Sequence, residues 1–109
     1  MSRHHVQSEF DSHPVVVVAG YDRPTKEFFL QVLPDDGDTE GEEVVLYSSL
    51  HEPQRDWRDP DTLHVVVAEL RLSLPPGMLD AVSNDRASNT GNRIVVHHFD
   101  QPPEVLLAG

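Results

Sequence analysis

Two apolar runs separated by an acidic insert constrain the fold of this chain more than any other feature. The runs, residues 27–33 and 43–47, each have the length of a strand. Between them, residues 34–42 read PDDGDTEGE, with no basic residue. Proline, glycine and clustered like charges oppose both helix and strand. The segment therefore predicts two strands of a hairpin joined by a loose, solvated loop.

A third strand is predicted before the hairpin. Residues 15–20, VVVVAG, form a continuous β-branched run, and the turn residues 20–25 that follow favour an antiparallel neighbour. Within residues 27–33, alternation places Phe28, Leu30 and Val32 on one side and Phe29, Gln31 and Leu33 on the other. We expect one side to pack on helices and Phe29 and Leu33 to be covered by a terminal segment or another subunit. A ligand-binding aromatic surface is the alternative.

Two helices are predicted after the hairpin. Asp59 or Asp61 suits the start of the first helix and Pro60 its first turn, and the apolar stripe comprises Leu63, Val66, Val67 and Leu70. A strand is the rival interpretation because residues 65–67 are all valine, but residues 68–72 extend the helical stripe. After the break LPPG, residues 76–86 predict a second helix with its apolar side formed by Met78, Leu79 and Val82.

A last strand is predicted at residues 93–99, paired either with residues 15–20 or with the free edge of residues 43–47. Residues 1–13 show no periodicity and predict a flexible N-terminal tail, and Pro102-Pro103 begins a C-terminal tail at residues 101–109. The predicted fold is a single α+β domain at residues 14–100. It has two layers, a sheet of about four mainly antiparallel strands with two short helices on one face, in the order β-β-β-α-α-β.

Charge and composition limit the partners. The chain has 19 acidic and 8 basic residues and a formal net charge of -11, so repulsion opposes direct binding to nucleic acid or to an anionic membrane. No cysteine is present, which excludes disulfides and thiolate sites. The polar N-terminus has no signal-peptide core, and no apolar run reaches the roughly 18 residues of a membrane span. A cytoplasmic monomer or weak homo-oligomer is expected.

The acidic insert is the first candidate site. Its carboxylates are spaced like a run of phosphates and suit a basic groove on a protein partner, although a plain solvated loop is the alternative. The alternating ligand spacing of a calcium-binding EF-hand loop is missing. The candidate partner-binding residues are Asp35, Asp36, Asp38, Glu40, Glu42 and Glu43.

A second candidate site is the turn at Tyr21, Asp22 and Arg23, which would lie near Arg93 if the last strand pairs beside it. A capped turn with an ion pair is the structural alternative. The chain contains none of the common phosphate-loop, nucleophile-elbow or zinc-protease motifs. The sequence thus favours a non-enzymatic binding or regulatory module over a small enzyme or ligand-binding domain at this turn.

Metal and cofactor sites are not predicted. The densest histidine cluster is His97-His98, followed by Asp100. Adjacent residues on a strand point to opposite faces, so these two imidazoles do not chelate one ion without a bulge.

Several short segments together carry a resemblance to a known group of proteins. They are Val18–Pro24, Phe28–Leu30, Leu46–Leu50, Leu74–Met78 and Gly91–Arg93. In these segments, within residues 15–96, the chain resembles a group of small uncharacterised acidic proteins found on bacterial plasmids and other mobile elements. The resemblance implies a bacterial, cytoplasmic, accessory context and no assigned activity or catalytic residues.

Overall fold

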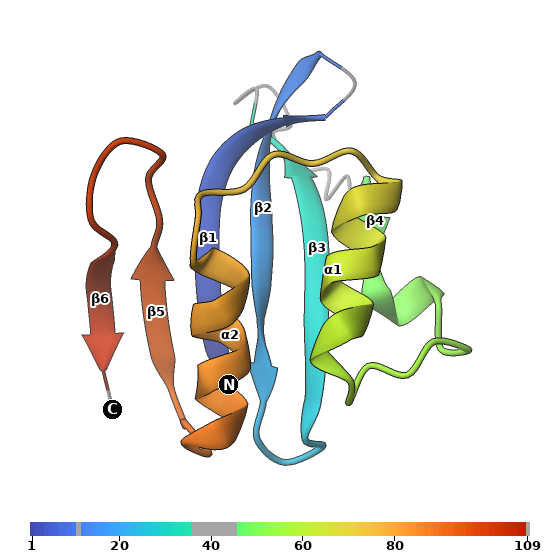
Figure 1. Ribbon diagram of the computed structural model, residues 1–109, viewed down its shortest axis with the longest axis vertical. Coiled ribbons are helices and arrows are strands. Elements are labelled where there is room, and N and C mark those ends of the chain that lie inside the picture. The colour runs from blue at the N-terminus through green and yellow to red at the C-terminus, as the bar shows by residue number, and fades with distance from the viewer. Residues whose placement is uncertain (11, 36–45, 109) are drawn as a thin grey trace, which may run out of the picture.

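The computed structural model describes residues 1–10, 12–35 and 46–108 and shows one six-stranded sheet with two helices on one face (Figure 1). The strands are β1 (Ser2–Phe10), β2 (His13–Asp22), β3 (Glu27–Pro34), β4 (Tyr47–Ser48), β5 (Arg93–Val96) and β6 (Glu104–Ala108). The helices are the 3-10 turn η1 (Ser49–His51), α1 (Pro60–Glu69) and α2 (Met78–Ala87). The prediction of an α+β fold with two helices on one face is confirmed. Within the described ranges, no helix has the length and apolar character needed to cross a membrane.

The number and direction of the strands differ from the prediction. The sheet order is β4-β3-β2-β1-β5-β6, and all neighbours are antiparallel except β1 and β5, which are parallel. The sheet is therefore mixed and has six strands, where about four mainly antiparallel strands were predicted.

Strand β1 is the main correction, because residues 2–10 were predicted to be a flexible tail. The strand lies inside the sheet between β2 and β5, with Val6 opposite Val17. Its inward residues are Ser2, His4 and Val6, all at most 2% exposed. Two of these three residues are polar, so the alternation of buried and exposed positions along β1 does not appear as an alternation of apolar and polar residues. Their burial depends on hydrogen-bonding partners from other elements.

The C-terminal part of the sheet also differs. Strand β5 pairs with β1, His4 lying beside Val95, and so has neither of the two partners that the sequence suggested. Residues 104–108, predicted to be part of a tail, form β6 and pair antiparallel with β5. Pro102 and Pro103 lie in the connection before β6, where a missing backbone donor is harmless.

The core lies between the sheet and the helices. Phe28, Leu30 and Val32 of β3 are buried, as predicted, and the helices contribute Leu63, Val66, Met78 and Val82. Helix α1 begins as predicted: the Asp59 carboxylate accepts a hydrogen bond of 3.0 Å from the amide of Asp61, and Pro60 occupies the first turn.

The opposite side of the sheet, here called the open face, is covered by no helix among the described residues (Figure 1). Alternation places Val18 of β2 and Phe29 and Leu33 of β3 on this side. The Phe29 ring lies across Gly20, where an added Cβ atom would approach the ring to 2.5 Å. Glycine at position 20 therefore allows the aromatic side chain to approach the backbone of β2 closely.

Candidate functional site

The open face carries a cavity of about 380 Å³. Its floor is formed by Val18, Phe29 and Leu33. Residues of β1, among them Arg3 and His5, form one side, and the segment 49–57 forms the other. We call this cavity the open-face pocket.

Backbone and side-chain hydrogen bonds attach the segment 49–57 to the edge of β3. The Phe28 amide donates to the Trp57 carbonyl at 2.7 Å, and the Leu30 amide donates to Ser49 Oγ at 3.2 Å. The Trp57 indole N–H donates to the Glu52 carbonyl at 2.8 Å, which holds the ring against the core at 6% exposure. This wall of the pocket is thus an extension of the sheet edge.

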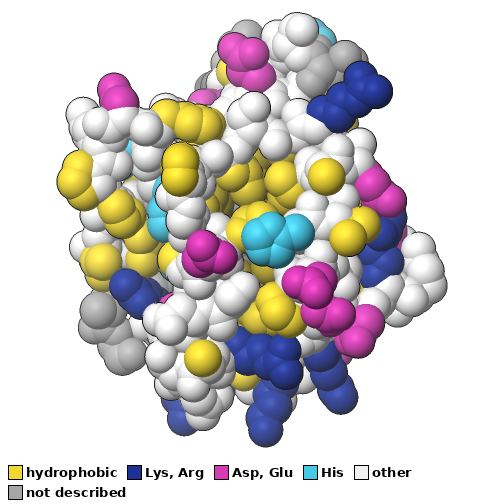
Figure 2. All heavy atoms as spheres, viewed as in Figure 1, with side chains coloured by type: hydrophobic (Ala, Val, Ile, Leu, Met, Phe, Trp, Pro, Cys, Tyr) yellow, Lys and Arg dark blue, Asp and Glu magenta, His cyan; other side chains and the backbone are white. Residues whose placement is uncertain are grey.

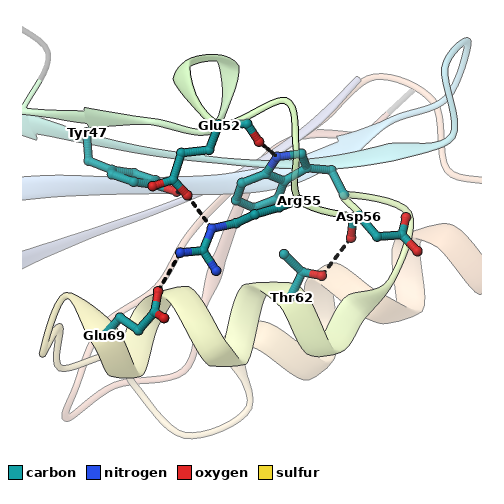
Figure 3. Close-up of polar contacts among 7 residues, drawn as sticks. Tyr47, Glu52, Arg55, Asp56, Thr62 and Glu69 are labelled. Atoms are coloured by element: carbon teal, nitrogen blue, oxygen red, sulfur yellow. Dashed lines mark hydrogen bonds and ion pairs between the residues drawn. The ribbon is translucent and has the colours of Figure 1, made fainter.

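A polar network joins the same segment to α1 (Figure 3). Arg55 binds the Glu52 carboxylate through Nε and the Glu69 carboxylate through Nη2, the latter at 2.7 Å. The Tyr47 hydroxyl donates to Glu52 Oε2 at 3.0 Å. Burial and the hydrogen bond and negative charge of Glu52 raise the pKa of Tyr47 to about 12, so the phenol remains a donor.

Two carboxylates lie at the end of the pocket next to the β2–β3 turn. Asp22 and Glu27 are directly opposite each other on neighbouring strands, and both line the pocket. The Thr25 hydroxyl donates to Asp22 Oδ2 at 3.0 Å. Among the described residues, no basic nitrogen lies within 4.0 Å of either carboxylate. The pocket therefore contains two acidic groups without a partner cation in the described part of the chain.

His5 supplies an uncharged polar group to the pocket. Burial, followed by the positive charges of Arg3 and His4, lowers the pKa of His5 below its usual value. The Nε2 atom of His5 is buried and has no hydrogen-bonding partner in the described part of the molecule. At neutral pH this imidazole is uncharged.

A buried polar chain lies on the helix-covered side of the sheet. His97 Nε2 and His4 Nδ1 are 2.7 Å apart, and His4 Nε2 is 2.5 Å from Asp85 Oδ2. The side chains of Asp85, His4 and His97 are 0%, 1% and 6% exposed, and none lines the open-face pocket. These enclosed side chains form a cross-link between α2, β1 and the residue that follows β5.

The environment of this chain controls its charge. Burial lowers the pKa of His97 to about 4, with the positive charges of His4, Arg93 and His98 adding to the effect. Burial by itself raises the pKa of Asp85, but hydrogen bonds from His4 and Ser2 and the charges of His4 and Arg93 outweigh it, so this pKa is lowered. The carboxylate is therefore ionised at neutral pH. The sequence did not predict this hydrogen-bonded group because His4, Asp85 and His97 are far apart in the sequence.

The residues of the predicted polar turn are divided between the two sides of the sheet. Tyr21 is buried in the core at 1% exposure, and Arg93 lies 3.4 Å from Asp85 Oδ1 on the helix-covered side. Asp22 faces the open-face pocket. Arg23 is exposed, and its Nη1 atom lies near Gly91. The structure thus assigns Asp22 alone of this group to the pocket.

The predicted acidic site falls mostly outside the described residues. Asp35 is described: its amide donates to the Pro14 carbonyl at 3.1 Å, and its carboxylate accepts from Gln7 Nε2 at 3.2 Å. The members outside the described ranges are Asp36, Asp38, Glu40, Glu42 and Glu43.

His97 and His98 were predicted to lie within a strand at residues 93–99, but β5 ends at Val96, so both residues follow the strand. His97 points to His4 on the helix-covered side, whereas His98 Nε2 is 3.7 Å from Glu104 Oε1. No group of three or more histidine, aspartate or glutamate side chains suited to a metal ion occurs among residues 1–10, 12–35 and 46–108.

Comparisons of this chain with protein-family models, with curated proteins and with solved structures found no match. The resemblance to plasmid-borne acidic proteins therefore stays a prediction.

Proposed function

We propose that this protein is a non-enzymatic binding module that takes a small ligand, or one side chain of a larger partner, into the open-face pocket. The observation that carries the proposal is the cavity itself, about 380 Å³ in volume with Phe29 and Trp57 in its lining. Ligand pockets of folded proteins have volumes of roughly 300–1,000 Å³ and combine an apolar lining with a few polar groups.

The rim of the pocket supports a binding role. Leu50 lines the pocket and is 78% exposed, the largest exposure among the large hydrophobic residues in the described ranges. Covering such a side chain with a ligand removes apolar surface from water, which stabilises a complex.

The polar groups of the pocket suit binding better than catalysis. Among the described residues, only the Thr25 hydroxyl is hydrogen bonded to a carboxylate of the pocket. It donates to Asp22 and has no histidine partner that could activate it. The buried histidines of the helix-covered side are enclosed. A nucleophile held by a base, the usual sign of covalent catalysis, is therefore absent from the described lining of the pocket.

The test is a fragment screen followed by chemical-shift mapping in two-dimensional NMR spectra. We expect bound fragments to shift the amides of residues 29–33 and 49–57. Leu50→Ser should weaken fragment binding several-fold without loss of stability. The matched control is Val65→Ser, which removes an apolar side chain of 49% exposure that does not line the pocket. Shifts confined to other regions, or equal weakening by both variants, would contradict the proposal.

A basic protein partner is the second candidate, favoured by the formal net charge of -11. Six of the 19 acidic residues lie within residues 35–43, so this segment concentrates negative charge. Such a concentration speeds association with a positively charged surface. The two candidates are compatible, because the acidic segment and the open-face pocket are formed by different residues.

A further inference from the structure

We propose that the open-face pocket selects organic cations, that is, a protonated amine attached to an apolar body. This inference depends on the proposed binding function and adds the chemical class of the ligand. It is carried by the pair of carboxylates at one end of the pocket, the aromatic ring of Phe29 on the same side of the sheet and the charge of the whole chain.

The Asp22–Glu27 pair is the first argument. The two residues are directly opposite each other in the antiparallel register of β2 and β3, so both side chains project from the open face. Like charges in such a pair repel and destabilise the sheet. Both residues are half-buried, and no described basic nitrogen lies within 4.0 Å of either carboxylate. A ligand ammonium between the two carboxylates would remove this repulsion.

The aromatic lining is the second argument. The Phe29 ring lies against Gly20 on the open face, so this ring is held in place before a ligand arrives. Aromatic faces attract cations, and they attract ammonium groups more strongly where water is excluded. Leu50 at the rim offers apolar surface to the body of the ligand.

The balance of charge around the pocket is the third argument. Arg3 also lines the pocket, but it is exposed, and the Met1 amino group bonds to Asn92 Oδ1 at 3.3 Å. His5 is uncharged at neutral pH because burial lowers its pKa. The formal net charge of -11 raises the local concentration of cations and opposes anions. The Lys and Arg side chains that gather near the β2–β3 turn are seen on the helix-covered side, opposite the pocket (Figure 2). The carboxylate pair and the net charge therefore favour a cationic ligand over an anionic one.

The experiment compares three probes of nearly the same shape: 2-phenylethylammonium, 2-phenylethanol and 3-phenylpropionate. Affinities are measured by NMR titration at low salt and neutral pH. We expect the ammonium to bind about tenfold more tightly than the alcohol, the ratio that about 1.4 kcal/mol produces, and the carboxylate to bind most weakly. Added salt should reduce the affinity of the ammonium more than that of the alcohol.

The test variant is Asp22→Asn with Glu27→Gln, which removes both charges and keeps an acceptor for the Thr25 hydroxyl. We expect this variant to lose the preference for the ammonium and to bind the alcohol as the wild type does. Glu9→Gln is the matched control, since Glu9 is an exposed acid of β1 that does not line the pocket.

The outcomes separate this inference from the proposed function. Equal affinity for ammonium and alcohol, tighter binding of the carboxylate, or an unchanged preference in the double variant would overturn the cation selectivity and leave a binding pocket. Absence of binding by all three probes, or shifts that map away from residues 29–33 and 49–57, would contradict both.

Discussion

At the scale of single residues, the hydrogen-bonded chain of His97, His4 and Asp85 is the part of the structure most sensitive to protons. Each imidazole has one donor and one acceptor nitrogen when neutral, so His97 can donate to His4 while His4 donates to Asp85. If both rings carried two N–H groups, two donors would face each other and the bond between the rings would break.

This arrangement predicts how stability depends on pH. The pKa of His97 is about 4 in the folded protein and 6.5 ordinarily, so between these values the unfolded chain binds more protons. The contribution of neutral His97 to the free energy of unfolding is therefore complete above pH 6.5 and is lost as pH falls toward 4. We expect a loss on the order of 3 kcal/mol, since each pKa unit corresponds to about 1.4 kcal/mol. Urea denaturation at pH 7, 5.5 and 4.5 measures it.

His97→Gln supplies the comparison, because it removes the titrating group from the buried chain. Its unfolding free energy should be lower at pH 7 and should change less between pH 7 and 4.5. His13→Gln alters an exposed histidine outside the chain and should keep the wild-type dependence on pH. An identical dependence in His97→Gln and the wild type would show that another group causes the loss.

At the scale of the elements, β3 separates the core from the pocket by the alternation of its side chains. Phe28 packs beneath the helices at 2% exposure, and its ring centroid lies 5.7 Å from that of Tyr21. Phe29 is half-buried on the open face. We therefore expect Phe28 to contribute mainly to stability and Phe29 to contact a ligand in the proposed binding function.

Alanine substitutions test this division. Phe28→Ala should lower the free energy of unfolding by about 3–5 kcal/mol, because it opens a cavity in the core. Phe29→Ala should lower the free energy of unfolding by only about 1 kcal/mol. This substitution should mainly reduce the affinity of the open-face pocket for its ligands. Chemical denaturation gives the stabilities and NMR titration the affinities. Equal losses of stability would mean that the open face is buried as deeply as the core.

At the scale of the whole molecule, charge is unevenly distributed. Figure 2 shows the helix-covered side, where Lys and Arg side chains gather at the end nearest the β2–β3 turn. The sequence places six of its 19 acidic residues within residues 35–43. If this segment binds a basic protein, association should slow steeply as salt rises through the physiological range, where the Debye length is about 8 Å.

Neutralisation tests this second binding mode once a partner has been isolated. The test variant replaces four acids together with Asn or Gln: Asp35, Asp36, Asp38 and Glu40. This variant should associate more slowly at low salt and should keep the circular dichroism spectrum of the wild type. The variant should also keep its affinity for probes of the open-face pocket. Equal association rates for variant and wild type at low salt would rule out a role for the acidic segment.

Local patterns in the sequence predicted several of the elements. The inward face of β3, the start of α1 at Asp59 and the second helix were predicted because hydrophobic periodicity and capping residues are local signals. The predicted last strand was too long, because β5 ends at Val96 and leaves His97 and His98 outside it. Of the residues predicted to form a polar site, Asp22 alone lines the open-face pocket, whereas Phe29 and Leu33 line it from the side of β3 that the sequence offered as an alternative binding surface.

Only the tertiary structure decided the place of β1, the partners of β5 and the candidate site. Strand β1 buries Ser2 and His4, and such polar burial is favourable only because distant groups, among them Asp85 and His97, satisfy the hydrogen bonds. The open-face pocket depends likewise on Gly20 lying beneath Phe29 and on Trp57 hydrogen bonding along β3. These contacts join residues far apart in the chain, and no local pattern encodes them.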